Sequence, residues 1–356
     1  MNIDSRVTPE ATDVVARLST LDRFLPLWIG LAMGAGLGLG AIFPDLDSQL
    51  DSVKIDTVSL PIAIGLLLMM YPVLAKVRYG QVRADRGNRR VYGITLFFNW
   101  LIGPLLMFGL AWLFLDDQPG LRTGLVIVGI APCIAMVLIW NDLAFGNREA
   151  AAVLVAINAL LQIVLFSVYG WFYLTVLPDW LGLDTASIDV SAWDIARSVL
   201  IFLGIPLVLG YLSRRLGERA KGVEWYEQRY LPRIGPIALY GLLLTIVFLF
   251  AMQGDRITRD PLDVARVAIP LAIYFALMWG ASFVLAHRIR LPYDQAVTVA
   301  FTSAGNNFEL AIAVCIAVFG ITSDQALAGT IGPLIEVPAL VALVYVALRA
   351  RRYFAQ

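Results

Sequence analysis

The chain has 356 residues, of which 59% are hydrophobic and 15% charged, and its formal net charge is zero. Soluble domains carry roughly 25% charged residues, so this composition, with a mean hydropathy of +0.76, excludes a soluble globular protein. It indicates a polytopic membrane protein in a lipid bilayer. The balanced charge suggests no nucleic-acid partner, and two cysteines inside apolar runs exclude a secreted disulfide framework.

Ten apolar runs predict ten transmembrane helices, because each crossing needs about 20 mostly apolar residues. In chain order they span approximately residues 25–43, 60–76, 92–115, 122–144, 150–177, 194–213, 233–253, 264–286, 295–319 and 325–347. We therefore divide the chain into an N-terminal tail (1–24), a first five-helix repeat (25–177), a connection (178–193), a second five-helix repeat (194–347) and a C-terminal tail (348–356).

The basic residues predict the orientation of these spans. Of the 27 Lys and Arg residues, 21 lie on the side that holds both termini, and most of them are in residues 76–90 and 214–233. Cytoplasmic loops carry an excess of Lys and Arg. We therefore expect both termini to be cytoplasmic, the connection 178–193 to be extracytoplasmic, and the location to be the cytoplasmic (inner) membrane.

The fourth predicted span, residues 124–144, carries two helix-disturbing residues near its middle, Gly129 and Pro132. Proline removes a backbone donor and clashes with the carbonyl four residues earlier. In hydrocarbon, such a break is tolerated only where the freed polar groups face protein or a water-filled cavity. The pattern predicts a discontinuous fourth helix.

A weak internal repeat extends this prediction to the ninth span. The segment after Pro61 (PIAIGLLL) resembles the segment after Pro236 (PIALYGLLL). Two halves of five spans must insert with opposite orientation, and inverted repeats with interrupted helices are typical of secondary transporters. The ninth span contains a polar, helix-poor cluster at Ser303, Gly305 and Asn306–Asn307. We expect a second break there.

Cys133 directly follows the first break. If a half-helix begins at Pro132, this thiol lies in its first turn, where unpaired N–H groups favour the negatively charged thiolate. We interpret Cys133 as a soft ligand near the middle of the membrane, although a free cysteine can also be a small buried hydrophobe. Cys315 lies in an uninterrupted apolar run and is interpreted as a packing residue.

All acidic residues but two fall in tails, loops or span ends, and the exceptions are Glu309 and Glu336. Ionisable groups at membrane depth are expensive and usually functional. Glu309 can carry protons, or it can form a capping box in which Asn306 caps the half-helix. Glu336 can relay protons or bond the backbone groups that Pro338 frees. Asn306 and Asn307 can bind a polar solute or cap the break.

Three further polar residues have less specific predictions. Asn158 and Gln162 are four residues apart on one face of the fifth span, and they either line a cavity or bond across helices. The only histidine, His287, lies in a cytoplasmic basic cluster, which excludes a histidine-rich metal site. We expect no metal centre, no cofactor and no enzymatic activity.

Two motifs resemble those of a known family. Residues 131–144 (APCIAMV, then WN and LA) are similar to the fourth-span signature of arsenical-resistance arsenite efflux permeases, and residues 301–313 (FTSA, then NNFELAIA) to their ninth-span signature. That family belongs to the bile acid/sodium symporter-like group. The resemblance implies an all-α protein with ten helices in two inverted five-helix repeats. Its discontinuous fourth and ninth helices cross in a core bundle beside a panel bundle, and Cys133 and Glu309 are the essential residues.

The expected function is secondary efflux of arsenite, with antimonite as a second candidate substrate. Arsenite at neutral pH is mainly an uncharged trihydroxide with a thiophilic arsenic atom. A neutral solute is not driven outward by voltage unless it is exchanged for charge, and exchange for an inward proton supplies roughly 2.3 kcal/mol per 100 mV. We therefore expect a metalloid/proton antiporter.

The alternative is a sodium-coupled organic-anion symporter of the same fold. Sodium needs several oxygen ligands, which Ser303, Asn306, Asn307 and Glu309 partly provide, but this reading gives no role to Cys133. An intramembrane hydrolase would need a nucleophile beside a base or a carboxylate pair, and no histidine falls inside a predicted span. A passive channel would require no proton gradient.

Overall fold

The computed structural model describes residues 24–43, 54–55, 58–78, 88–183, 191–259 and 261–354. Within these ranges the chain is helical, apart from a small antiparallel hairpin of β1 (Lys54–Ile55) and β2 (Val58–Ser59), in which Lys54 pairs with Ser59. Nearly all of the predicted N-terminal tail and residues 184–190 of the connection 178–193 lie outside the described residues.

The helices of the first half match the ranges of the first five predicted spans. They are α3 (Leu25–Ile42), α5 (Leu60–Ala75), α6 (Arg89–Phe97), η2 (Phe98–Ile102), α7 (Gly103–Phe114), α8 (Pro119–Gly129), α9 (Val137–Leu143), α10 (Arg148–Trp171), η3 (Phe172–Val176) and α11 (Leu177–Trp180). The segments η2 and η3 are single π-helical turns inside longer helices. Such a turn holds one extra residue without ending the helix.

The second half likewise consists of long helices and one interrupted helix. Its helices are α12 (Ala192–Val199), η4 (Leu200–Gly204), α13 (Ile205–Lys221), α14 (Val223–Trp225), η5 (Tyr226–Tyr230), α15 (Leu231–Arg259), α16 (Pro261–Arg288), α17 (Tyr293–Ala304), α18 (Phe308–Phe319), α19 (Asp324–Ala350) and the 3₁₀ turn η6 (Arg351–Phe354).

Six helices in the described residues are long and apolar enough to cross a membrane. They span Arg89–Phe114, Arg148–Trp180, Ala192–Lys221, Val223–Met252, Leu262–Arg288 and Asp324–Phe354. Shorter apolar helices occupy Leu27–Ile42, Leu60–Ala75 and Phe308–Phe319. The protein is therefore an all-helical, multi-pass membrane protein, while the ten crossings, the inverted repeat and the domain boundaries stay predictions.

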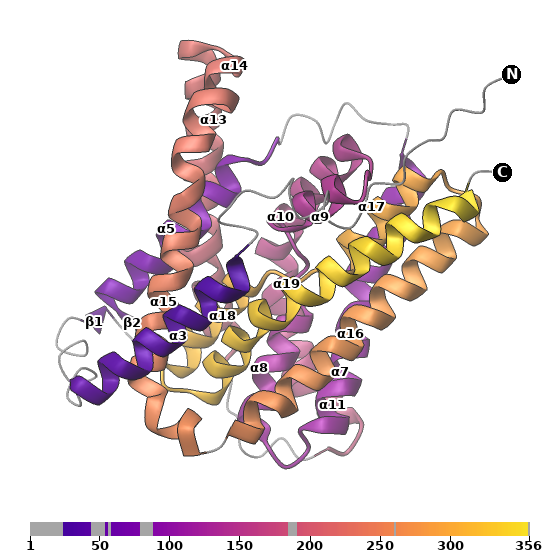
Figure 1. The fold of residues 1–356 in the computed structure, drawn as a ribbon. Coiled ribbons are helices and arrows are strands. Elements are labelled where there is room, and N and C mark those ends of the chain that lie inside the picture. Colours follow the sequence, from indigo (N-terminus) through magenta and orange to yellow (C-terminus); the bar gives the residue numbers. More distant parts are fainter. Residues whose placement is uncertain are drawn as a thin grey trace, which may run out of the picture.

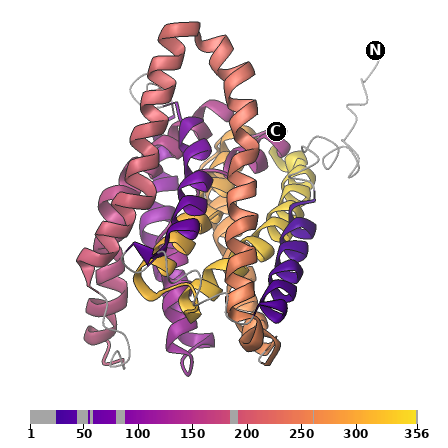
Figure 2. The same ribbon diagram turned by 90° about the vertical axis from the view of Figure 1, so that its left-hand side faces the viewer.

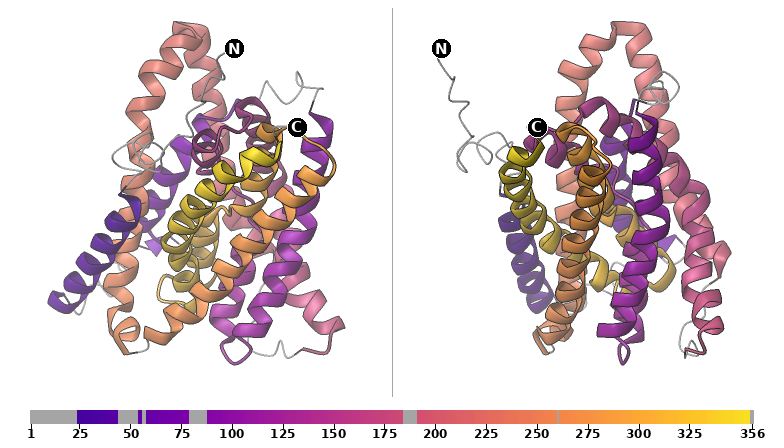
Figure 3. Two further views of the ribbon diagram at one scale, coloured as in Figure 1. Left: turned by 45° about the vertical axis from the view of Figure 1, so that its right-hand side comes forward. Right: turned by 90° about the vertical axis from the view of Figure 1, so that its right-hand side faces the viewer.

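The helices form two groups. In the first group, α3, α5, α13 and α15 pack against one another (Figure 1). The hairpin of α13 and α15 projects beyond the other helices at the end of the molecule that holds the C-terminus (Figure 2). The second group surrounds the interrupted helices, and in it α16 and α19 run side by side (Figure 3).

Glycines allow the closest approach within the first group. A Cβ on Gly40 of α3 would lie 2.2 Å from the Ala251 carbonyl oxygen of α15, and one on Gly241 of α15 would lie 2.8 Å from the Gly65 carbonyl oxygen of α5. Small residues at such contacts are typical of helix packing in membranes, where close backbone approach replaces the hydrophobic driving force. This packing fixes α5 and α15, which form one wall of the candidate site.

Candidate functional site

The first break separates α8 from α9. Helix α8 ends at Gly129, and α9 begins at Val137. The prediction that the half-helix begins at Pro132 is therefore wrong, and Cys133 does not lie in its first turn. The physical reason is that Pro132 has no N–H, while the N–H of Cys133 donates to the carbonyl of Gly305 at 3.0 Å instead of closing a helical turn.

The second break, predicted from the repeat, lies between α17 and α18. Helix α17 ends at Ala304, and Gly305 has an extended backbone conformation (φ −75°, ψ 148°). Helix α18 begins at Phe308, after Asn307. The polar cluster at the centre of the ninth span therefore interrupts the helix, although it contains no proline.

The two breaks pair with each other. Pro132 and Asn306 form an isolated antiparallel bridge. The N–H of Cys133 donates to the Gly305 carbonyl, and the N–H of Asn307 donates to the Ala131 carbonyl at 2.7 Å. Backbone polar groups freed by an interruption must find partners in a membrane protein. Here each interruption supplies partners for the other.

Side chains from neighbouring helices complete the pairing. Gln162 of α10 donates from Nε2 to the Pro132 carbonyl at 2.6 Å, and its Oε1 accepts from Asn307 Nδ2 at 2.8 Å. Asn158 Oδ1 accepts from Trp100 Nε1 at 3.3 Å. Of the two roles left open for Asn158 and Gln162, the structure shows bonding across helices.

The possible capping box, in which Asn306 would cap the second half-helix, is wrong. Asn307, not Asn306, caps α18, because its Oδ1 accepts from the N–H of Leu310 at 3.2 Å. The Asn306 side chain instead donates to the Val128 carbonyl at 3.0 Å, which also accepts from the Ala131 N–H at 3.1 Å. Asn307 therefore caps the second half-helix, while Asn306 connects the second break to the C-terminal end of α8.

Glu336 and Cys133 meet at Gly305. Glu336 Oε1 accepts from the Asn306 N–H at 3.3 Å. A Cβ on Gly305 would lie 3.4 Å from Cys133 Sγ and 3.3 Å from Glu336 Oε1. Glycine at position 305 therefore lets a thiol and a carboxyl group approach the same point.

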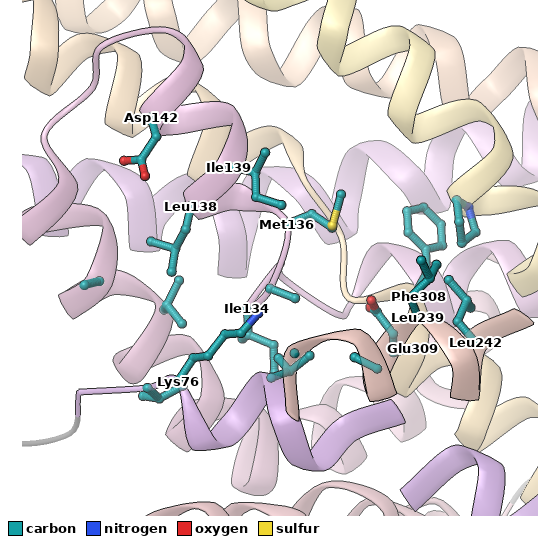
Figure 4. Close-up of a pocket in the computed structure, with 18 of the residues that line it drawn as sticks. Lys76, Ile134, Met136, Leu138, Ile139, Asp142, Leu239, Leu242, Phe308 and Glu309 are labelled. Carbon is teal, nitrogen blue, oxygen red and sulfur yellow. The ribbon is translucent and has the colours of Figure 1, made fainter. Parts of the chain in front are cut away.

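A cavity of about 370 Å³ lies between α5 and α15 of the first group and α9, α10, α18 and α19 of the second. Glu309 and Glu336 line it, as do the apolar side chains of Met136 and Phe308. Figure 4 shows Phe308 and Glu309 at one side of the cavity and Asp142 at the opposite side. Cys133 is 1% exposed and is not among the lining residues, whereas its neighbour Ile134 is.

The opposite end of the cavity is charged. Its exposed lining residues there are Lys76, Arg78, Asp142 and Arg148, and Arg148 Nε lies 3.5 Å from Asp142 Oδ2. Arg78 Nη2 likewise donates to Glu227 Oε2 at 2.5 Å. The exposed end of the cavity therefore carries charges of both signs, and Glu309 and Glu336 line the same cavity.

Sequence reasoning did not identify Asp142 or Tyr274 as site residues. Asp142 follows the break by about two helical turns, and this spacing could have placed it beside the cavity. The hydroxyl of Tyr274 is 3.5 Å from Asn306 Nδ2, a contact between distant segments that left no sequence signal. Among the described residues, no group of three or more His, Cys, Asp or Glu side chains could hold a metal ion.

The chain is similar in sequence to known membrane transporters. The model of the "Sodium Bile acid symporter family" matches residues 63–260. The chain is 57% identical to the arsenical-resistance protein Acr3 of Corynebacterium glutamicum, over 94% of this chain and 90% of that relative. It is 30% identical to the arsenical-resistance protein Acr3 of Alkaliphilus metalliredigens, over 94% of each. Human sodium/bile acid cotransporter 4 is 24% identical over 59% of this chain and 45% of that protein.

Proposed function

This chain belongs to the arsenical-resistance proteins of the sodium/bile acid symporter family, and from that premise we propose that it exports arsenite in exchange for protons. It is a multi-pass membrane transporter of arsenical resistance. The proposal concerns the residues that bind the metalloid, the residues that carry the proton and the direction of transport.

The observation that carries the proposal is the meeting of one thiol and two carboxyl groups at the paired breaks. Cys133 and Glu336 converge at Gly305, and Glu309 and Glu336 line the adjoining cavity. Arsenic is thiophilic, as expected for a soft centre. On binding, the Cys133 sulfur replaces one hydroxyl of the trihydroxide, and the thiol proton leaves with that hydroxyl as water.

A single thiol suits transport better than a set of thiols. Three converging sulfur ligands would hold arsenic and make release slow, whereas one sulfur allows it to leave. Ile134 and Met136 line the cavity in front of Cys133, which is buried behind them. Arsenite therefore reaches the sulfur only when this broken segment moves, and such movement is expected as the two helix groups rock about the site.

Protons provide the driving force in this proposal. Export of a neutral solute gains roughly 2.3 kcal/mol per 100 mV if one proton enters in exchange. Glu309 is half-buried at the cavity and can exchange a proton with it, while Glu336 is 3% exposed and contacts the Asn306 backbone. We assign proton coupling to Glu309, with Glu336 as a relay. Antimonite, a chemically similar trihydroxide, is proposed as a second substrate.

The charge distribution supports cytoplasmic termini in the inner membrane. The exposed mouth of the cavity includes Lys76 and Arg78, which belong to the basic connection that the positive-inside rule places in the cytoplasm. In that orientation the cavity opens toward cytoplasmic arsenite.

A sodium-coupled organic-anion symporter is the second candidate. One observation favours it: the cavity has many apolar lining residues together with basic ones such as Lys76, which suits an amphipathic anion. Under that reading, uptake in vesicles requires sodium and is inhibited by organic anions. Sodium-independent, proton-driven arsenite uptake supports the first proposal instead.

The experiment measures arsenite uptake into everted membrane vesicles that hold a proton gradient. We expect Cys133→Ser to lose uptake, while Cys315→Ser, a matched change at the other buried cysteine, keeps it. Glu309→Gln loses accumulation against the gradient. Full uptake by Cys133→Ser would exclude the ligand role, and concentrative uptake by Glu309→Gln would exclude the proton-carrier role.

A further inference from the structure

One side chain bonds to both breaks. Gln162 is fully buried on α10. Its amide nitrogen donates to the Pro132 carbonyl at 2.6 Å, and its amide oxygen accepts from Asn307 Nδ2 at 2.8 Å. A neutral amide has a donor end and an acceptor end, and both are used here, each on a different interrupted helix.

On the first break, this contact fixes the peptide that carries the thiol residue. The Pro132 carbonyl and the Cys133 N–H belong to the same planar peptide unit. Gln162 holds the carbonyl, and Gly305 holds the N–H at 3.0 Å. A displacement of Cys133 therefore displaces the acceptor of Gln162.

On the second break, the contact fixes the cap of the half-helix that carries Glu309. Asn307 binds Gln162 through Nδ2 and the Leu310 N–H through Oδ1. Glu309 lies in the first turn of α18, next to Leu310. Hydrogen bonds in series thus connect the Cys133 peptide with the turn that carries Glu309, and bonds arranged in such chains strengthen one another.

We propose that Gln162 is a positioning residue that couples the two breaks, so that arsenic on Cys133 and a proton on Glu309 exclude each other. This inference rests on the proposed arsenite/proton exchange. When Cys133 takes arsenic, its peptide moves, Gln162 follows Pro132, and Asn307 changes the start of α18. Without Gln162 only the backbone bonds between the breaks remain, so the two events are coupled more weakly and part of the arsenite crosses without its proton.

The same helix supplies a matched control. Asn158 lies four residues before Gln162 on the same face of α10, is also fully buried, and bonds to Trp100. Its hydrogen bond within the described residues joins α10 to Trp100 and not to either break. Substitution at Asn158 removes a buried amide from α10 without removing the connection between the breaks.

The test measures proton flux and arsenite flux together in vesicles that contain wild type, Gln162→Met or Asn158→Leu. We expect the ratio of proton to arsenite flux to fall roughly tenfold in Gln162→Met, within the range typical of coupled sites. A residue that only stabilises the fold would change both fluxes in proportion. Asn158→Leu keeps the wild-type ratio.

A second variant, Gln162→Glu, tests the coupling role if Gln162→Met does not reach the membrane. A protonated carboxyl can donate to the Pro132 carbonyl and accept from Asn307, whereas a carboxylate only accepts. As the pH rises and the introduced carboxyl loses its proton, we expect its flux ratio, relative to wild type at the same pH, to fall from normal to low. Glu309 and Glu336 are present in both proteins, so their own titration cancels in this comparison.

A wild-type flux ratio in Gln162→Met, or a Gln162→Glu ratio that follows wild type at every pH, would overturn the coupling role. Failure of the underlying function is a separate result: wild type itself would then transport arsenite without any proton flux.

Discussion

The two breaks have different local causes and the same tertiary outcome. The first occupies residues 130–136, contains Pro132, and leads into a helix whose N-cap residue, Met136, makes no side-chain cap. The second occupies residues 305–307, contains no proline, and leads into a helix that Asn307 caps. Both end in the bridge between Pro132 and Asn306.

This difference shows that the residues that start an interruption need not be the contacts that maintain it. Proline prevents a helical bond covalently, whereas glycine and asparagine only favour other conformations. Because both segments remain open, the shared requirement is the set of hydrogen bonds between them. The longer break places Cys133 at the bridge, and the shorter one places Glu309 directly after it. The following substitutions test this view.

The largest effect is expected for Gly129→Ala, at the end of α8. A Cβ there would lie 2.3 Å from Met107 Cβ, and overpacking of a core typically costs about 1–3 kcal/mol. We expect a clear fall in melting temperature in detergent and in the amount of protein in the membrane. Gly109→Ala is the control, since no atom lies within 4 Å of its Cβ position. Equal stability of the two variants would show that α8 does not need glycine where the first break begins.

Asn307→Ala should have the next largest effect. It removes the cap of α18, worth about 0.5–2 kcal/mol, and leaves Gln162 Oε1 without the partner shown at 2.8 Å. We expect arsenite transport to fall by at least about tenfold, which corresponds to roughly 1.4 kcal/mol.

The control for this variant is Ser323→Ala. Ser323 caps α19 through the Ala326 N–H at 3.2 Å, at a helix start away from the bridge. It should lower stability by a similar amount while transport per folded molecule stays normal. If both cap variants transport equally well, the cap at the second break has no special role.

Pro132→Ala should have a smaller effect. The bonds of Cys133, Asn307 and Gln162 hold the first break open without proline. We expect transport to change by less than about threefold, or roughly 0.7 kcal/mol. Pro72→Ala, in the uninterrupted α5, serves as a comparison in the same assay. Complete loss of transport in Pro132→Ala alone would show that proline itself, rather than the pairing, maintains the first break.

The smallest effect concerns the connection between α7 and α8. Arg266 Nη1 donates to Asp117 Oδ2 at 2.9 Å, and this hydrogen bond from Arg266 lowers the pKa of Asp117 below its ordinary value. A carboxyl whose pKa is lowered on folding stabilises the folded state above its unfolded pKa and loses that contribution as pH falls through the folded pKa.

We therefore expect Asp117→Asn to melt slightly below wild type at neutral pH, with a difference that shrinks as the pH falls below the ordinary aspartate pKa of about 3.9. Melting curves across this range check the sign. A difference that grows on acidification would contradict it. Because the pair is exposed, it should leave transport through the breaks unchanged.

The sequence alone determined the membrane class and indicated both interruptions, and it predicted Cys133, Glu309 and Glu336 as site residues. These follow from local properties: the length of apolar runs, the covalent chemistry of proline, and the rarity of acids at membrane depth. The motif resemblance also indicated the family, which the comparisons confirmed.

Only the tertiary structure decided how these parts meet. It placed the start of α9 at Val137, gave the cap of α18 to Asn307, and brought Gln162 between the two breaks. These outcomes depend on hydrogen bonds between residues that lie far apart in the chain. A backbone group freed in one helix can be satisfied by many side chains, and its partner is fixed only when the helices pack.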